Sequence, residues 1–157
     1  MKILLIYPDT NPMSIIPKRI INIEPLGLEY LAGDLYDHDV TILDFKMEKD
    51  WRRVLRECEP DVIGLTGTVV HTSRMLENAR YAKMIDPTVI TVVGGTQATL
   101  VPEDFNDLSF DYLIQGQRPE IFRQLIETLE SNGDPANVKG IMISSPKGWI
   151  ATGAADP

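Results

Sequence analysis

Apolar residues in this chain gather in short unalternating runs, separated by longer stretches with apolar residues every three or four positions. Unalternating runs of four to eight residues are typical of strands buried on both faces of a parallel sheet, whereas the wider spacing predicts helices. The predicted strands cover residues 2–7, 40–44, 61–66, 89–93 and 110–115. The predicted helices cover residues 25–35, 50–57, about 72–85, and 119–132.

The alternation of strands and helices predicts the fold class. Five strands alternating with helices indicate a doubly wound α/β domain with a parallel sheet, and right-handed crossovers favour the strand order 2-1-3-4-5. Residues 138–144 and 149–152 flank the turn residues Pro146, Lys147 and Gly148, a pattern that predicts a C-terminal β-hairpin within an extension over residues 137–153. The length of 157 residues suits a single domain.

Composition narrows the class of partner. The formal net charge of −8 disfavours binding to nucleic acid, because an acidic surface repels phosphate backbones. No apolar run approaches the length of a membrane span, and the single cysteine, Cys58, allows no intramolecular disulfide and no cysteine-ligated metal cluster. From these features we expect a cytoplasmic protein with no membrane partner.

Glycines end two successive predicted strands. Gly94 and Gly95 follow the fourth strand, and Gly116 follows the fifth. Ligands of open parallel sheets bind outside the carboxyl ends of the strands, and glycines there let the backbone turn sharply and approach a ligand closely. The same glycines could serve only as turns, because a glycine-rich loop alone is a weak signal.

The sequence lacks the motifs of several common ligand-binding and catalytic sites. The first strand is followed by Pro8 and Asp9 rather than by a Gly-x-Gly-x-x-Gly fingerprint, and no Gly-x-Ser-x-Gly elbow occurs. His38 precedes the second strand, at the wrong end of the sheet for chemistry, and is predicted to be structural. His71 follows the third strand at the ligand-binding edge, where a capping role competes with a functional one.

Four motifs in order resemble the N-terminal cobalamin-binding domains of radical S-adenosylmethionine proteins. They are EPLGLEYLA at residues 24–32, PDVIGLT at 60–66, VGGTQATLVPE at 93–103 and DYLIQGQRPE at 111–120. The resemblance implies that the chain is either a standalone relative or, as we expect, the N-terminal domain of a longer radical S-adenosylmethionine protein. Its partner would be the radical domain of that protein, which would carry S-adenosylmethionine and an iron–sulfur cluster.

The resemblance implies a cofactor, cobalamin, and a reaction class, methyl transfer or related radical chemistry. An Asp-x-His-x-x-Gly motif is absent, so cobalamin is expected base-off, without a histidine ligand, and with its cobalt held by the corrin rather than by the protein. The loop at residues 8–24 would lie near the lower face of the corrin. The residues expected to bind the cofactor are Thr66, Gly67, Thr68, Val69, His71, Gly94, Gly95, Thr96, Gln97, Gly116, Gln117 and Glu120.

For the glycines and threonines among these residues, physical reasoning independently predicts a role in binding the cofactor. Small residues at Gly94, Gly95 and Gly116 could open a slot for the nucleotide tail of cobalamin. Helix starts after Gly67 and Gly116 would favour its phosphate and amides. The hydroxyls of Thr66, Thr68 and Thr96 could bind corrin amides or could simply cap helices.

Two motifs depart from the family pattern. Gln97 stands where the family has histidine, and Gln117, Arg118 and Pro119 interrupt a Gly-Glu-Gly-Glu pattern with one extra residue. These departures leave an alternative function open. In that alternative, the chain keeps the fold, binds no cobalamin and serves as a docking module.

Overall fold

The computed structural model describes residues 1–9, 26–45, 47–48 and 50–154. Within these ranges, strands form one seven-stranded sheet in the order β2-β1-β3-β4-β5-β6-β7. The first five strands are parallel, and β6 and β7 are antiparallel additions at one edge. The strands are β1 (Lys2–Tyr7), β2 (Asp39–Asp44), β3 (Val62–Thr66), β4 (Ile90–Gly94), β5 (Tyr112–Ile114), β6 (Ile141–Ile143) and β7 (Ile150–Ala151).

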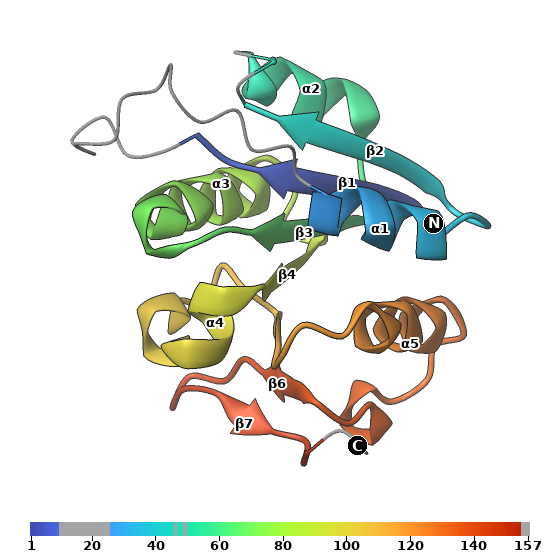
Figure 1. Cartoon of the computed structure of the whole chain (residues 1–157), viewed down its shortest axis with the longest axis vertical. Helices are drawn as coiled ribbons and strands as arrows, with labels where there is room; N and C mark the ends of the chain where they lie inside the picture. The colour runs from blue at the N-terminus through green and yellow to red at the C-terminus, as the bar shows by residue number, and fades with distance from the viewer. Residues whose placement is uncertain (10–25, 46, 49, 155–157) are drawn as a thin grey trace.

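Helices cover both faces of the sheet (Figure 1). The α-helices are α1 (Leu26–Asp34), α2 (Trp51–Cys58), α3 (Thr72–Ile85), α4 (Thr96–Leu100) and α5 (Pro119–Glu130). Short 3-10 helices are η1 (Val69–His71), η2 (Pro102–Phe105) and η3 (Pro135–Asn137). Helices α1 and α5 pack on one face, and α2, α3 and α4 pack on the other.

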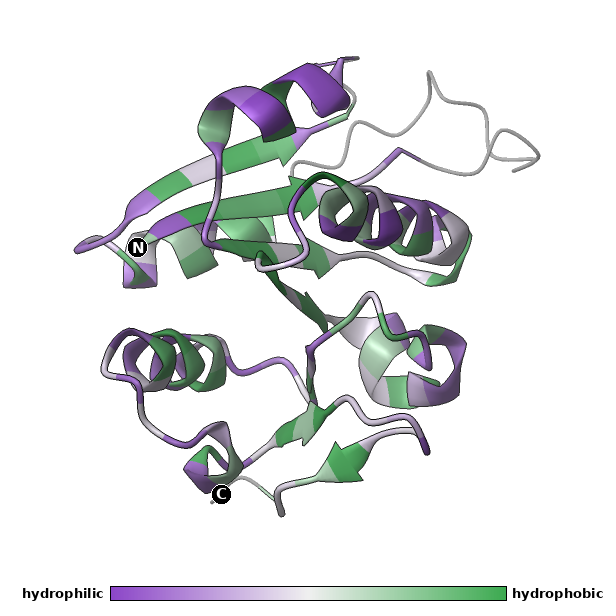
Figure 2. Cartoon of the chain, turned by 180° about the vertical axis from the view of Figure 1, so that it is seen from behind, coloured by the Kyte–Doolittle hydropathy of each residue, from purple (hydrophilic) through white to green (hydrophobic). Residues whose placement is uncertain are grey.

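Alternate residues of each strand point to opposite faces and build two separate cores. In β1, Leu4 and Ile6 pack with α2 and α3, whereas Ile3 and Leu5 pack with α1 and α5. All four side chains are nearly inaccessible to solvent. Figure 2 shows these apolar strands at the centre of the molecule, with polar residues along the outer sides of the helices.

The structure confirms the predicted fold class, the strand order 2-1-3-4-5 and the antiparallel C-terminal strands. Among the α-helices, α4 was not predicted, because a polar segment was expected at these five residues. Because α4 is barely longer than one turn, it leaves no helical periodicity in the sequence to detect. Among the described residues, no helix has the length and apolarity that crossing a bilayer requires.

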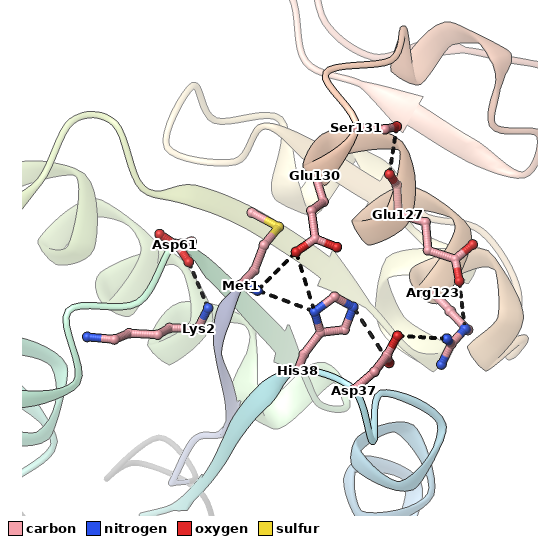
Figure 3. A network of polar contacts seen from close by, with 9 residues as sticks. All are labelled: Met1, Lys2, Asp37, His38, Asp61, Arg123, Glu127, Glu130 and Ser131. Carbon is pink, nitrogen blue, oxygen red and sulfur yellow. Dashed lines mark hydrogen bonds and ion pairs between the residues drawn. The ribbon is translucent and has the colours of Figure 1, made fainter.

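His38 lies at the amino ends of the strands, remote from their carboxyl ends, as expected of a structural residue. Its Nδ1 atom lies 3.3 Å from the amino group of Met1, which also donates to Glu130 of α5 at 3.3 Å (Figure 3). Nearby, Arg123 of α5 pairs with Asp37 and donates to the backbone carbonyl of Asp34. This polar network ties α5 to the turn between α1 and β2.

A second polar anchor holds β4 against β5. One carboxylate oxygen of Asp111 accepts hydrogen bonds from the Thr91 backbone N–H at 2.7 Å and from Lys83 Nζ at 2.6 Å. The Thr91 hydroxyl, which is fully buried, lies 3.0 Å from the same oxygen and 2.6 Å from the Ser109 carbonyl. Asp111 therefore satisfies donors from both α3 and β4.

We expect Asp111→Asn to lower the free energy of unfolding by about 1–2 kcal/mol, because the substitution removes a charged acceptor shared by several donors. Urea unfolding followed by circular dichroism measures this change. The matched control is Glu57→Gln, which removes an exposed ion pair with Arg53 and should cost less than about 1 kcal/mol. Equal losses in the two variants would contradict the anchoring role of Asp111.

Candidate functional site

A cavity of about 680 Å³ opens at the carboxyl ends of the parallel strands, on the face covered by α1 and α5. Its floor comes from β1, β3, β4 and β5, and its walls come from α1 and the start of α5. Helix α1, which follows β1, packs on one face of the sheet, and α3, which follows the neighbouring strand β3, packs on the other. The carboxyl ends of β1 and β3 therefore form the topological switch point of the fold, and the cavity lies there. Open α/β sheets bind ligands at such crevices.

Two positions in the floor of the cavity are glycines, which project no side chain. Gly64 lies beside Leu5 and Val92 in the sheet register, and Thr66 lies beside Gly94. A Cβ atom on Gly64 would stand 2.9 Å from Leu5 Cδ2, so no side chain fits there without movement of its neighbours. A Cβ atom on Gly94 would meet only Ile114, at an ordinary distance of 3.7 Å.

Helix α1 supplies an apolar wall that sequence reasoning did not assign to the site. Leu26 and Tyr30 line the cavity while remaining 64% and 65% exposed. They are four residues apart and therefore share one helix face, whereas Leu28 is buried and borders both the core and the cavity. Apolar residues on more than one face of a short helix are the sequence signal that could have revealed a helix bordering both a core and a cavity.

Two glycine turns form the rim of the cavity. Gly95, at the start of α4, has φ +91°, and Gly116, between β5 and α5, has φ +84°. A Cβ atom on Gly95 would collide with the Thr66 hydroxyl, whereas one on Gly116 would have no heavy atom within 4 Å. Both turns need glycine for backbone conformation, and the turn at Gly116 also faces open space.

Eight of the twelve residues predicted for cofactor binding line this one cavity, although they come from three separate loops of the chain. They are Thr66, Gly67, Thr68, Gly94, Gly95, Thr96, Gly116 and Gln117. The structure thus brings together the carboxyl ends of β3, β4 and β5, as expected for a parallel sheet.

The other four predicted residues lie outside the cavity lining. Val69 is exposed on η1, and Glu120 lines a neighbouring cavity of about 630 Å³ beside α5. Gln97 is 9% exposed and donates from Nε2 to Asp104 at 2.7 Å. Gln97 therefore faces Asp104 and does not line the cavity.

His71 is also outside the lining, but it supports the turn that precedes it. The 5% exposed ring accepts a hydrogen bond at Nδ1 from the Thr68 backbone N–H at 3.1 Å. The neutral ring therefore carries its proton on Nε2. Tyr7 packs on this ring with centroids 5.1 Å apart, and burial, followed by the nearby Asp44 carboxylate, raises the pKa of Tyr7. Tyr7 is therefore a neutral phenol at physiological pH, and its ring lines the cavity.

Among the described residues, no group of three or more histidine, cysteine or acidic side chains is arranged to hold a metal ion. The cavity instead combines an apolar floor and wall with threonine hydroxyls and backbone groups at its rim. Such a lining is typical of pockets for organic ligands, in which a few polar groups fix the orientation.

These features define a doubly wound α/β domain with a cavity at its switch point. The comparison with known families is more specific, because residues 21–126 match the model of the B12 binding domain. The chain therefore belongs to the B12-binding domain family.

Curated relatives include methyltransferases. An uncharacterized methyltransferase of Pyrococcus horikoshii is 31% identical over 90% of this chain and 32% of its own length. The hopanoid C-3 methylase of Methylococcus capsulatus is 29% identical over 94% of this chain and 30% of its own length. The chain thus spans about a third of the length of these relatives.

Solved structures share the fold. The radical S-adenosylmethionine methyltransferase TsrM from Kitasatospora setae, solved with cobalamin and a [4Fe-4S] cluster, has a TM-score of 0.80 and 20% identity over 98% of this chain and 29% of its own. The cobalamin-dependent S-adenosylmethionine radical enzyme OxsB, solved with aqua-cobalamin, has a TM-score of 0.78 and 19% identity over 99% of this chain and 22% of its own.

The two rim glycines should differ in their tolerance of a side chain. We expect Gly116→Ala to cost about 1 kcal/mol of unfolding free energy, from backbone strain alone. Gly95→Ala should cost more, because its methyl group also collides with the Thr66 hydroxyl. Urea unfolding of the two variants tests this order, and a larger loss in Gly116→Ala would contradict the geometry of the rim.

Proposed function

We propose that this chain binds cobalamin base-off, with the nucleotide tail of the cofactor in the cavity between α1 and α5. It would present the cofactor for methyl transfer or related radical S-adenosylmethionine chemistry. The observation that carries this proposal is the glycine-rimmed cavity at the carboxyl ends of β3, β4 and β5, in a chain of the B12-binding domain family.

The size and lining of the cavity fit the tail. Its volume of about 680 Å³ lies within the range of about 300–1,000 Å³ that is usual for small-molecule pockets. That volume suits a nucleotide-sized group rather than a whole corrin. Gly94 leaves room over the sheet, and Val92 and Ile114 offer an apolar surface to the benzimidazole ring.

Polar groups at the rim fit the hydrophilic parts of the same tail. The Thr66 and Thr96 hydroxyls can donate to phosphate or amide oxygens, whereas the Thr68 hydroxyl, 3.1 Å from His71 Nδ1, can accept from amide N–H groups. The N-terminus of α5, beside Gly116 and Gln117, carries the partial positive charge that favours an anion. Cobalamin, when bound, supplies a cobalt centre that can carry a methyl group.

Neither histidine supports ligation of the cobalt. His38 lies at the amino ends of the strands, and His71 is buried outside the cavity lining with Nδ1 bonded to Thr68. We therefore propose a base-off cofactor without a histidine in place of its base. The loop predicted to lie near the lower face of the corrin falls largely at residues 10–24, outside the described residues.

The length of the relatives supports a further domain. Because the chain spans about a third of curated methyltransferases, we propose that S-adenosylmethionine and an iron–sulfur cluster belong to a radical domain of the same longer protein. That domain would be the physiological partner of the cavity rim.

Titration with hydroxocobalamin tests the proposal. After incubation and desalting, the protein should keep a corrin chromophore with a base-off absorption spectrum. A colourless protein whose melting temperature does not change with hydroxocobalamin would contradict cofactor binding by this chain. That result would favour the alternative, a docking module that keeps the fold without the cofactor.

Gly94→Val should abolish this retention while leaving the chain folded. The new side chain enters the cavity from a strand position with ordinary backbone geometry and only Ile114 nearby. The matched control is Gly33→Ala on α1, an exposed glycine outside the cavity lining with open space around it. Retention of cobalamin by folded Gly94→Val would contradict the placement of the tail.

A further inference from the structure

We propose that Thr99 is a positioning residue for the cofactor site, because its hydroxyl fixes the two glycine turns of the rim relative to each other. The inference rests on the proposed function. Thr99 does not line the cavity, so its effect on a ligand would pass through the turns that it joins.

The hydroxyl of Thr99 bonds to both turns at once. It donates to the Gly95 carbonyl at 2.9 Å and accepts from the Gly116 backbone N–H at 3.0 Å. Gly95 and Gly116 lie 21 positions apart in the chain and belong to the β4–α4 and β5–α5 connections. One side chain therefore links the two connections across the mouth of the cavity.

The backbone of these turns does not supply the link itself. Strands β4 and β5 pair only through Val92 with Tyr112 and Val93 with Leu113, so their ladder ends before either glycine. Beyond that point the hydroxyl of Thr99 receives the Gly116 N–H, which would otherwise lose its partner in a half-buried site. The distance between the turns thus depends on a side chain rather than on the sheet.

A second side-chain contact also links the two connections, nearer to solvent than the Thr99 hydroxyl. Gln117 donates from Nε2 to the Thr96 hydroxyl at 3.1 Å, and both side chains are exposed at the rim. Exposed hydrogen bonds compete with water and hold a separation weakly. The Thr99 contact, which is partly buried, is therefore the one expected to set the width of the slot.

Three variants test this role in the apo protein and with hydroxocobalamin as the probe. Thr99→Val keeps the shape of the side chain and removes its hydroxyl, and we expect it to weaken the dissociation constant for hydroxocobalamin about five- to tenfold. Thr99→Ser restores the hydroxyl and should bind within about twofold of the unmodified chain. Should Thr99→Val not fold, Thr99→Ala removes the same hydroxyl without a branched side chain.

Thr128→Val is the matched control. Thr128 on α5 also donates to the carbonyl four residues earlier, at 2.7 Å from Gln124 O, but that hydrogen bond is exposed and Thr128 lies outside the cavity lining. Its substitution should leave hydroxocobalamin affinity unchanged. Hydrogen exchange provides a second readout, because the Gly116 amide should exchange faster in Thr99→Val than in Thr99→Ser.

The outcomes separate this inference from the proposed function. Unmodified affinity in folded Thr99→Val, or equal weakening in Thr99→Val and Thr99→Ser, would overturn the positioning role and leave cobalamin binding intact. Absence of hydroxocobalamin binding in every protein, the unmodified chain included, would overturn the proposed function and this inference with it.

Discussion

The site depends on the absence of side chains at sheet positions where side chains would normally pack. Gly64 and Gly94 lie on the α1 and α5 face of adjacent strands and line the cavity. Leu5 and Phe122 lie close over Gly64, whereas the interior opens over Gly94 instead of closing into core. Neighbouring positions on the same face, such as Ile3 and Val62, are fully packed. The change from core to cavity therefore occurs along single strands, within a few residues.

The amino halves of the strands contribute mainly to the core, whereas their carboxyl ends form the cavity. The amino halves of the strands bury large side chains and are tied to α5 and α3 by the networks around His38 and Asp111. The carboxyl halves end in threonines and glycines that expose backbone groups. The closely packed amino halves thus support a rim whose turns have positive φ at Gly95 and Gly116.

Much of the fold could be predicted because parallel strands buried on both faces give unbroken apolar runs, such as residues 2–7 and 61–66. Eight of the predicted site residues lie together because strand ends meet at one edge of such a sheet. The positions of Gln97 and His71 outside the cavity lining could not be predicted, because they depend on contacts with Asp104 and Thr68 that leave no periodic pattern in the sequence. The cavity wall at Tyr30 was not predicted, because an exposed apolar residue cannot be told from an ordinary surface residue in the sequence. Helix α4 was not predicted, because a single helical turn has no periodic pattern.

The central claim is that cobalamin enters the cavity between α1 and α5. Amide chemical shifts of the isotopically labelled chain, recorded during titration with hydroxocobalamin, test it most directly. The account predicts that the amides of Gly64, Gly94 and Gly116 shift and that those of His38 and Asp111, at the opposite end of the sheet, stay unchanged. Shifts confined to the opposite end of the sheet, or no shifts at all, would contradict it.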